Sequence, residues 1–254
     1  MRAKKRLGQN FLKNKRILEE IIRVGEVSKK DVILEAGPGH GELTELLARR
    51  AKKVIAVEKD RDLIPLLQEK FSKNKNVEIC KGDILEFNSN KLPDKNYKLI
   101  ANIPYYITSR FLRLFLSQTK FRPKLAVLMV QKEVAERILV KDGKESLLSL
   151  SVKAYGKPEI IRSVNKKFFS PPPKVDSAII KISEISDKFF RENRISEKKF
   201  FEILRKAFQQ KRKMLRHSLK LPKSDFGMSD FGMRRPEELS LEDWAEISLY
   251  FIGD

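Results

Sequence analysis

Short runs of consecutive apolar residues alternate along the first half of the chain with stretches in which apolar residues recur every three or four positions. Consecutive apolar residues are typical of buried strands, and the three-or-four spacing is typical of helices with one apolar face. The strands predicted in this way fall at 32–36, 53–57, 99–102 and 125–130, and a further short strand is predicted at 77–83. Because strands that alternate with helices form parallel sheets covered on both faces, this pattern predicts an α/β fold.

The pattern changes beyond the fifth run. Two further strands are predicted at 160–164 and 175–182, and three consecutive prolines make the loop between them extended and stiff. From about Ser186 only helical spacing remains. The sequence therefore predicts a large domain over residues 1–185 and a small helical domain over residues 186–254.

A glycine-rich turn, residues 37–41, joins the first strand to the first helix that follows it. This arrangement opens many nucleotide-binding α/β units, because glycines allow close backbone approach and helix N–H groups suit an anionic end of a ligand. The order Gly-x-Gly-x-Gly departs from the Gly-x-Gly-x-x-Gly of NAD-binding folds. A compact ligand with an amino-acid carboxylate is therefore favoured over a pyrophosphate, and a purely structural tight turn is the alternative.

Acidic residues follow the second strand and end the third. Glu58 lies 21 residues after Gly37, where a carboxylate is placed to accept hydrogen bonds from ribose hydroxyls. Asp83 could accept a hydrogen bond from an adenine amino group, and a turn aspartate is its structural alternative. Together with the glycine turn, the two acids indicate a site for an adenine nucleoside.

The fourth strand ends in a polar amide, Asn102. Pro104 removes a backbone donor and stops the strand, and the aromatic pair Tyr105 and Tyr106 follows at once. Ligands of open α/β sheets bind at the carboxyl ends of the strands. This edge could therefore hold a flat ring with an amine at its rim.

The formal net charge of +20 in 254 residues predicts attraction to a polyanion. Residues 1–16 contain seven Lys or Arg and no acid, residues 205–223 contain eight and no acid, and residues 224–254 contain two basic and eight acidic residues. The charged surface of a thermophilic protein would contain more basic and more acidic residues alike, and would not explain this excess of basic residues. A nucleic acid is therefore the favoured partner. The expected phosphate contacts are Lys4, Lys5, Arg6 and, along one basic helix, Arg205, Lys206, Lys211, Arg212, Lys213 and Arg216.

Several classes of protein are disfavoured. No apolar run approaches the roughly 20 residues of a membrane helix, and the N-terminus lacks the apolar segment of a secretory signal. One cysteine allows no internal disulfide, and two separated histidines give no metal-ligand spacing. We therefore expect a cytoplasmic protein with no metal and no membrane partner, and by default a monomer.

A series of short motifs makes the chain resemble the S-adenosylmethionine-dependent adenine-N6 methyltransferases of ribosomal RNA, most closely the KsgA-type small-subunit dimethyltransferases. The motifs are Leu7–Leu12, Glu35–Gly39, Glu58, Gly82–Asp83, Asn102–Ser109, Gln131–Ala135, Pro173–Ser177 and Ala207–Lys213. Bacterial members often have Leu where Ile103 stands. The resemblance implies a Rossmann-like class I methyltransferase sheet, with seven mostly parallel strands and a small C-terminal helical domain.

The resemblance also implies roles for individual residues. Contacts with S-adenosylmethionine are expected at Asn10, Leu12, Gly37, Gly39, Glu58, Asp83, Ile84 and Asn102. Asn102 and the carbonyl of Ile103, held by Pro104, would accept hydrogen bonds from the target amine. Tyr105 and Phe169 would stack on the flipped adenine. The implied substrate is a pair of adjacent adenosines near the 3′ end of small-subunit ribosomal RNA in the assembling subunit.

Three alternatives stay open at this point. The related Erm resistance methyltransferases also carry Asn-Ile-Pro-Tyr and act on large-subunit RNA. A DNA adenine methyltransferase would share the same chemistry. A ribosome-assembly factor that only binds RNA would need the basic residues but not Asn102. A dehydrogenase is disfavoured by the order of the glycines.

Overall fold

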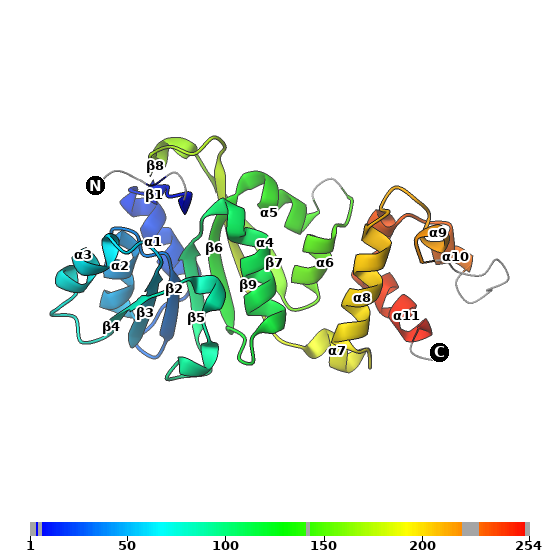
Figure 1. Cartoon of the computed structure of the whole chain (residues 1–254), viewed down its shortest axis with the longest axis horizontal. Coiled ribbons are helices and arrows are strands. Elements are labelled where there is room, and N and C mark those ends of the chain that lie inside the picture. Colours follow the sequence, from blue (N-terminus) through cyan, green and yellow to red (C-terminus); the bar gives the residue numbers. More distant parts are fainter. Residues whose placement is uncertain (1–3, 5–6, 141–142, 220–228, 252–254) are drawn as a thin grey trace. The chain divides into compact units, whose positions relative to one another are not determined.

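The computed structural model describes residue 4 and residues 7–140, 143–219 and 229–251, which fold as two compact units (Figure 1). Unit 1 contains Met1–Ala135 and Lys157–Ile185, and unit 2 contains Glu136–Gly156 and Ser186–Asp254. The sequence places a single boundary after residue 185. The structure differs, because the segment Glu136–Gly156 belongs to the helical unit and the chain crosses between the units three times.

A seven-stranded sheet forms the centre of unit 1, in the order β4-β3-β2-β5-β6-β9-β7 (Figure 1). The first five strands in this order are parallel, and β9 runs antiparallel to both of its neighbours, β6 and β7. The strands are β2 (Val32–Ala36), β3 (Lys53–Glu58), β4 (Val77–Lys81), β5 (Lys98–Asn102), β6 (Leu125–Gln131), β7 (Lys157–Val164) and β9 (Ser177–Ser183). The predicted α/β fold with a mostly parallel sheet is confirmed.

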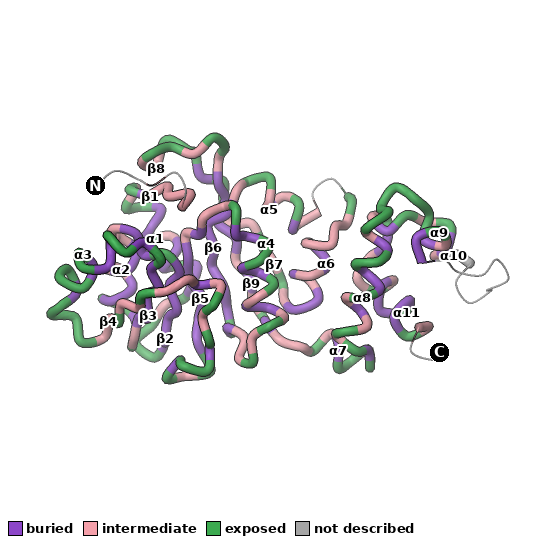
Figure 2. Tube along the Cα trace, in the orientation of Figure 1, coloured by how far each residue is buried: buried purple, intermediate pink, exposed green. Residues whose placement is uncertain are grey.

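Helices flank this sheet and bury its central strands (Figure 2). They are α1 (Lys15–Val24), α2 (Glu42–Arg50), α3 (Leu63–Lys70), α4 (Thr108–Arg113) and the start of α5 (Lys132–Leu139), with short turns η2 (Ile84–Glu86), η3 (Ser89–Lys91), η4 (Tyr105–Ile107), η5 (Leu114–Gln118) and η6 (Lys166–Phe168). In α1, Ile17 and Ile21 face the sheet and pack in one cluster with Ile33 and Met129. Alternate strand residues such as Leu34 are buried as well, as expected for a sheet covered on both faces.

A separate two-stranded sheet was not predicted. β1 (Phe11–Leu12) pairs antiparallel with β8 (Phe169–Ser170), and Lys13 N donates a further hydrogen bond to Phe168 O at 3.1 Å. Strands of two residues are too short to show an alternating pattern, so the sequence gives no sign of them. The pairing fixes the N-terminal segment against the loop between β7 and β9.

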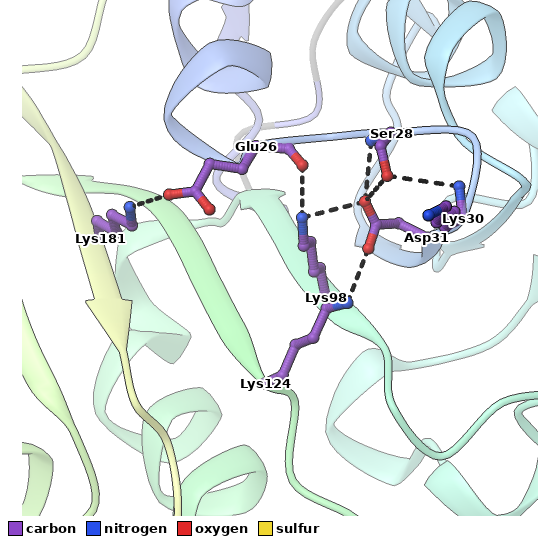
Figure 3. Close-up of polar contacts among 7 residues, drawn as sticks. All are labelled: Glu26, Ser28, Lys30, Asp31, Lys98, Lys124 and Lys181. Atoms are coloured by element: carbon purple, nitrogen blue, oxygen red, sulfur yellow. Dashed lines mark hydrogen bonds and ion pairs between the residues drawn. The ribbon is translucent and has the colours of Figure 1, made fainter.

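An ion network lies where β2, β5 and β6 begin (Figure 3). The Asp31 carboxylate accepts hydrogen bonds from Lys98 at 3.1 Å, from Lys124 at 2.8 Å and from the N–H and hydroxyl of Ser28 at 2.9 and 2.8 Å. Burial raises the pKa of Asp31, but these donors outweigh it and hold the pKa well below its usual range. Lys98 also donates to the carbonyl of Glu26. The network therefore ties three strand beginnings to one carboxylate.

The described residues of unit 2 form only helices and turns, as predicted. Beyond α5 they are α6 (Leu147–Lys153), α7 (Lys188–Glu192), α8 (Glu197–Phe208), α9 (Leu215–Leu219), α10 (Ser229–Gly232), η8 (Pro236–Glu238) and α11 (Leu241–Tyr250). An aromatic cluster joins α7 and α8 to the residues after α6: the Phe190 ring lies 5.2 Å from that of Tyr155 and 5.4 Å from that of Phe200. No helix in the described ranges of either unit is long and apolar enough to cross a membrane.

The prediction of one continuous basic helix is wrong. Helix α8 ends at Phe208, Lys211, Arg212 and Lys213 lie in the turn that follows, and Arg216 is on α9. The residues from 209 to 213 offer no apolar side chain to bury, and closely spaced like charges destabilise a helix. The basic residues are therefore carried by a helix end, a turn and a second helix.

Candidate active site

Two clefts of about 490 and 330 Å³ lie at the carboxyl ends of the parallel strands of unit 1, and they share Phe11, Gly37, Gly39 and Asn102 as walls. The larger is also lined by Leu7, Gln9, Asn10, Glu58, Lys59 and Tyr106, and the smaller by Leu12, Leu18, Glu35, Pro38, Glu42 and Leu43. Both volumes include space that is open to solvent.

The glycine turn shapes the floor shared by the two clefts. Gly37 and Gly39 have φ of +67° and +62°, a region that L side chains rarely adopt. A Cβ on Gly37 would meet nothing within 4 Å, whereas one on Gly39 would lie 2.8 Å from the Phe11 ring. The turn thus presents bare backbone to the clefts and allows the N-terminal segment to lie directly against it.

Glu58 is buried at the end of β3 and lines the larger cleft. Its Oε1 accepts a hydrogen bond from Asp60 N at 2.7 Å, and its Oε2 accepts one from Gly39 N at 3.2 Å. Burial raises the pKa of Glu58, and these backbone donors offset part of the shift. A carboxylate offers about four lone-pair positions, so each oxygen can accept one more hydrogen bond from a ligand hydroxyl.

Asn102 ends β5 and lines both clefts. Its Nδ2 donates to the backbone carbonyl of Asn10 at 3.1 Å. A carbonyl oxygen can only accept, so this contact fixes which end of the amide faces Asn10 and leaves Oδ1 as the acceptor for a ligand. The predicted role of Asn102 as an acceptor for an amine therefore has the orientation it requires.

Asp83 lies beside the larger cleft rather than in its wall. Its Oδ2 pairs with Lys59, a residue of that wall, at 2.7 Å, and its Oδ1 accepts from Leu85 N at 3.0 Å. Burial raises the pKa of Asp83, but the bond from Lys59 and that from Leu85 N outweigh it and lower the pKa. Asp83 would therefore bind an adenine amine only by sharing or exchanging the Lys59 contact.

The two predicted stacking residues are held by the protein itself. The Tyr105 hydroxyl hydrogen-bonds to Ser177 Oγ at 2.6 Å, and burial raises the pKa of Tyr105. Phe169 is 4% exposed and packs with Leu12. The predicted catalytic and cofactor-binding residues outside the two cleft walls are Ile103, Pro104, Tyr105, Asp83, Ile84 and Phe169. The roles of all the predicted site residues, in the walls or outside them, stay predictions.

Tyr106 is 61% exposed and lines the larger cleft. The sequence assigns it no role except as the neighbour of Tyr105 in an aromatic pair. Gln9 and Phe11 are further wall residues that the prediction leaves out. The only sequence feature that could have identified them is their position beside Asn10 and Leu12 in the same motif.

The N-terminal segment is tied to the loop after β3. The Lys4 ammonium lies 2.5 Å from both the Asp60 and the Asp62 carboxylates, and Gln9 Nε2 donates to Asp60 at 2.8 Å. The predicted contact of Lys4 with RNA phosphate therefore competes with two carboxylates. Lys5 and Arg6 lie outside the described residues.

Glu35 is a site residue that the sequence prediction did not single out. It is 1% exposed, lines the smaller cleft, and its Oε2 has no hydrogen-bond partner within the described ranges. Burial raises the pKa of Glu35 to about 8. A ligand that brings positive charge to this cleft would favour the ionised form of Glu35 and lower its pKa.

We expect Glu35→Gln to change how stability depends on pH. Folded Glu35 keeps its proton up to pH about 8, whereas the unfolded chain loses it above about 4.5, so this group lowers the stability progressively as the pH rises between these values. Relative to wild type, the variant should gain roughly 3 kcal/mol between pH 5 and pH 8. Urea unfolding at several pH values measures this, with Glu192→Gln on exposed α7 as the control. Parallel profiles for wild type and Glu35→Gln would contradict the expectation.

The fold and the site together define a class. A Rossmann-like sheet with a glycine turn after β2, a carboxylate at the end of β3 and an amide at the end of β5 is the arrangement of class I methyltransferases. The chain belongs to the ribosomal RNA adenine dimethylase family, whose model matches residues 1–250.

Curated relatives and solved structures agree with this membership. The chain is 41% identical over 265 residues to the ribosomal RNA small subunit methyltransferase A of Dehalococcoides mccartyi, covering 100% of this chain and 90% of that protein. It is 44% identical to the protein of the same name from Fusobacterium nucleatum, covering 85% of this chain and 82% of that one.

A crystal structure of a dimethyladenosine transferase from Plasmodium falciparum matches with a TM-score of 0.82 and 30% identity, over 96% of this chain and 98% of that chain. The 23S rRNA methyltransferase ErmE matches with a TM-score of 0.77 and 25% identity, over 94% of this chain and 98% of that chain. These likenesses extend through nearly the whole length of the chain.

Proposed function

We propose that this protein transfers methyl groups from S-adenosylmethionine to N6 of two adjacent adenosines near the 3′ end of small-subunit ribosomal RNA, during assembly of that subunit. The family and the names of the curated relatives support this substrate over the large-subunit RNA of the Erm-type alternative. The single observation that carries the chemistry is the orientation of Asn102, whose Oδ1 remains available where both clefts meet. We infer a cytoplasmic protein that works as a monomer.

The donors and acceptors of the clefts fit S-adenosylmethionine. Glu58 can accept hydrogen bonds from the ribose hydroxyls, and the bare backbone of the glycine turn can face the amino-acid carboxylate. The positive charge of such a ligand in the smaller cleft would favour ionisation of the buried Glu35, whose Oε2 has no hydrogen-bond partner within the described ranges. The bound molecule supplies a methyl group on a sulfonium sulfur, which is strongly electrophilic.

The protein's part is to position a weak nucleophile. The N6 lone pair of adenine is delocalised into the ring, so the amine reacts slowly unless it is held pyramidal. Acceptors at Asn102 Oδ1 and the Ile103 carbonyl would hold the two N–H groups, direct the lone pair at the methyl group and stabilise the positive charge that grows on nitrogen. No strong general base is required, because the product ammonium releases its proton readily to water.

The base must leave its helix or loop to reach this edge of the sheet. Extrusion costs a few kcal/mol of stacking, which aromatic side chains of the site can offset. Tyr105 and Phe169 are our candidates for this contact, on the basis of the family resemblance.

Methyl transfer from labelled S-adenosylmethionine to ribosomal RNA tests the proposal. We expect incorporation into small-subunit RNA, and reverse-transcription stops at two adjacent adenosines near its 3′ end. Stops confined to large-subunit RNA would establish the Erm-type alternative instead. Activity on DNA oligonucleotides alone would contradict the assignment to RNA.

A further inference from the structure

The N-terminal segment, the loop between β7 and β9 and the start of α5 together carry five exposed lysines, which we call the loop lysines. They are Lys13, Lys132, Lys166, Lys167 and Lys174. The nearest acidic residues in sequence are Glu133 and Asp176, and Asp176 accepts a hydrogen bond from the backbone N–H of Lys166 at 2.9 Å. Within the described ranges none of the five ammonium groups forms an ion pair with a carboxylate.

Hydrogen bonds hold these separate segments together. Lys13 N donates to Phe168 O at 3.1 Å, Lys166 Nζ donates to Lys174 O at 3.3 Å, and Lys132 N donates to Asp176 O at 3.0 Å. The segments are joined further by the pairing of β1 with β8 (Figure 1). The five lysines therefore form one surface rather than five scattered charges.

This surface borders the candidate active site. Lys132 directly follows β6, in which Met129 is the register partner of Asn102. Tyr105, three residues beyond Asn102, hydrogen-bonds to Ser177 at the start of β9, just after the loop. A strand whose base reached Asn102 would therefore run close to the loop lysines.

The lysines at the opposite ends of the strands, where β2, β5 and β6 begin, differ from the loop lysines in their partners. There Lys98 and Lys124 are paired with Asp31, and Lys181 is paired with Glu26 at 2.6 Å (Figure 3). These three lysines are thus neutralised by carboxylates, whereas the exposed Lys29, Lys30 and Lys52 near the same strand ends form no ion pair within the described ranges. The loop lysines are therefore distinguished by their position beside the candidate active site. The ammonium groups of clustered lysines without carboxylate partners repel one another and attract an anionic polymer, and the phosphate groups of a nucleic acid carry the opposite charge.

We propose that the loop lysines bind the phosphate backbone of the RNA strand that enters the Asn102 site. This rests on the proposed function for the identity of the polymer, and it adds a binding surface in unit 1 to the basic residues expected to bind RNA from unit 2. The ring of Phe168, over which Lys167 Nζ lies at 5.5 Å, adds an aromatic element to the same surface.

The test compares two triple variants with the same change in net charge. One replaces Lys166, Lys167 and Lys174 by Gln. The control replaces Lys29, Lys30 and Lys52 by Gln, three exposed lysines near the beginnings of β2 and β3. Binding of a labelled RNA hairpin with two adjacent unpaired adenosines is measured from 50 to 300 mM salt, with S-adenosylmethionine affinity and thermal unfolding measured alongside.

We expect the loop variant to bind RNA about 10- to 100-fold more weakly at 100 mM salt and to lose about 2 from the slope of log affinity against log salt, since each single-strand phosphate contact contributes about 0.7. Its S-adenosylmethionine affinity and unfolding temperature should match wild type. The control should bind RNA within threefold of wild type.

Equal RNA affinities and salt slopes for the two triple variants would overturn the proposal. So would a loop variant that loses binding to anionic phosphatidylserine vesicles while keeping that to RNA. A wild-type protein that shows the expected difference between the variants but methylates no RNA would support the surface and contradict the reaction, so the two proposals fail separately.

Discussion

Asn102→Ala should lose methyl transfer by about 10²- to 10³-fold while RNA and S-adenosylmethionine affinities stay within a few-fold of wild type. The side-chain oxygen is expected to act on the amine mainly as positive charge develops on nitrogen, so its loss raises the barrier more than it weakens binding. The matched control is Asn74→Ala, an exposed asparagine before β4, which should leave the rate unchanged.

Single-turnover rates with labelled S-adenosylmethionine measure this effect, and filter binding measures RNA affinity. Asn102→Asp adds a second comparison, because an ionised carboxylate keeps an acceptor but cannot donate to the Asn10 carbonyl that orients the amide. We expect it to be impaired as well. An Asn102→Ala protein with more than a third of the wild-type rate would refute the role of this side chain in methyl transfer.

Asp31→Asn should lower the free energy of unfolding by about 3–5 kcal/mol at pH 7. The substitution leaves Lys98, whose side chain is 7% exposed, without its carboxylate partner, and an unpaired buried charge is costly. Lys124 and Ser28 lose the same partner. The matched control, Glu192→Gln in an exposed pair with Lys188, should cost no more than about 0.5 kcal/mol.

The effect of Asp31 should also depend on pH in a defined direction. The pKa of Asp31 in the folded protein lies below its ordinary value of 3.8. Ionised Asp31 therefore stabilises the fold fully at pH values well above 3.8, and this stabilisation is lost as the pH falls from 3.8 toward the folded pKa. Urea unfolding should therefore show the gap between wild type and Asp31→Asn narrowing below about pH 4. A gap under 1 kcal/mol at pH 7 would show that the network contributes little to folding.

Much of the site could be predicted because it lies at strand ends. The acid at Glu58 and the amide at Asn102 each follow an uninterrupted apolar run, and a parallel sheet places such ends at one edge. The structure indeed brings both residues to the walls of the same cleft. The local sequence pattern was enough to predict these two positions, because the strands of a parallel sheet all end on the same side.

Other features depend on contacts between distant segments, which a local pattern does not encode. The pairing of Lys4 with Asp60 joins residues 56 positions apart, and Phe11 meets the glycine turn only because β1 pairs with β8. The apolar spacing within Glu136–Gly156 predicts helical structure, but it does not tell whether this segment packs in unit 1 or in unit 2. The break after Phe208 was a different error, because the absence of apolar residues beyond it was visible in the sequence.

The short ladder between β1 and β8 has a thermodynamic consequence. One of its strands carries Phe11 and Leu12, which line the clefts proposed to bind S-adenosylmethionine, and the other belongs to the loop that bears Lys166, Lys167 and Lys174. A ligand that favours one arrangement of this ladder changes the affinity of a second ligand bound on the other side of the ladder. The second ligand then changes the affinity of the first by the same factor. Affinities for nucleic acid and methyl donor measured one at a time therefore need not describe the ternary complex, in which their coupling is an observable of its own.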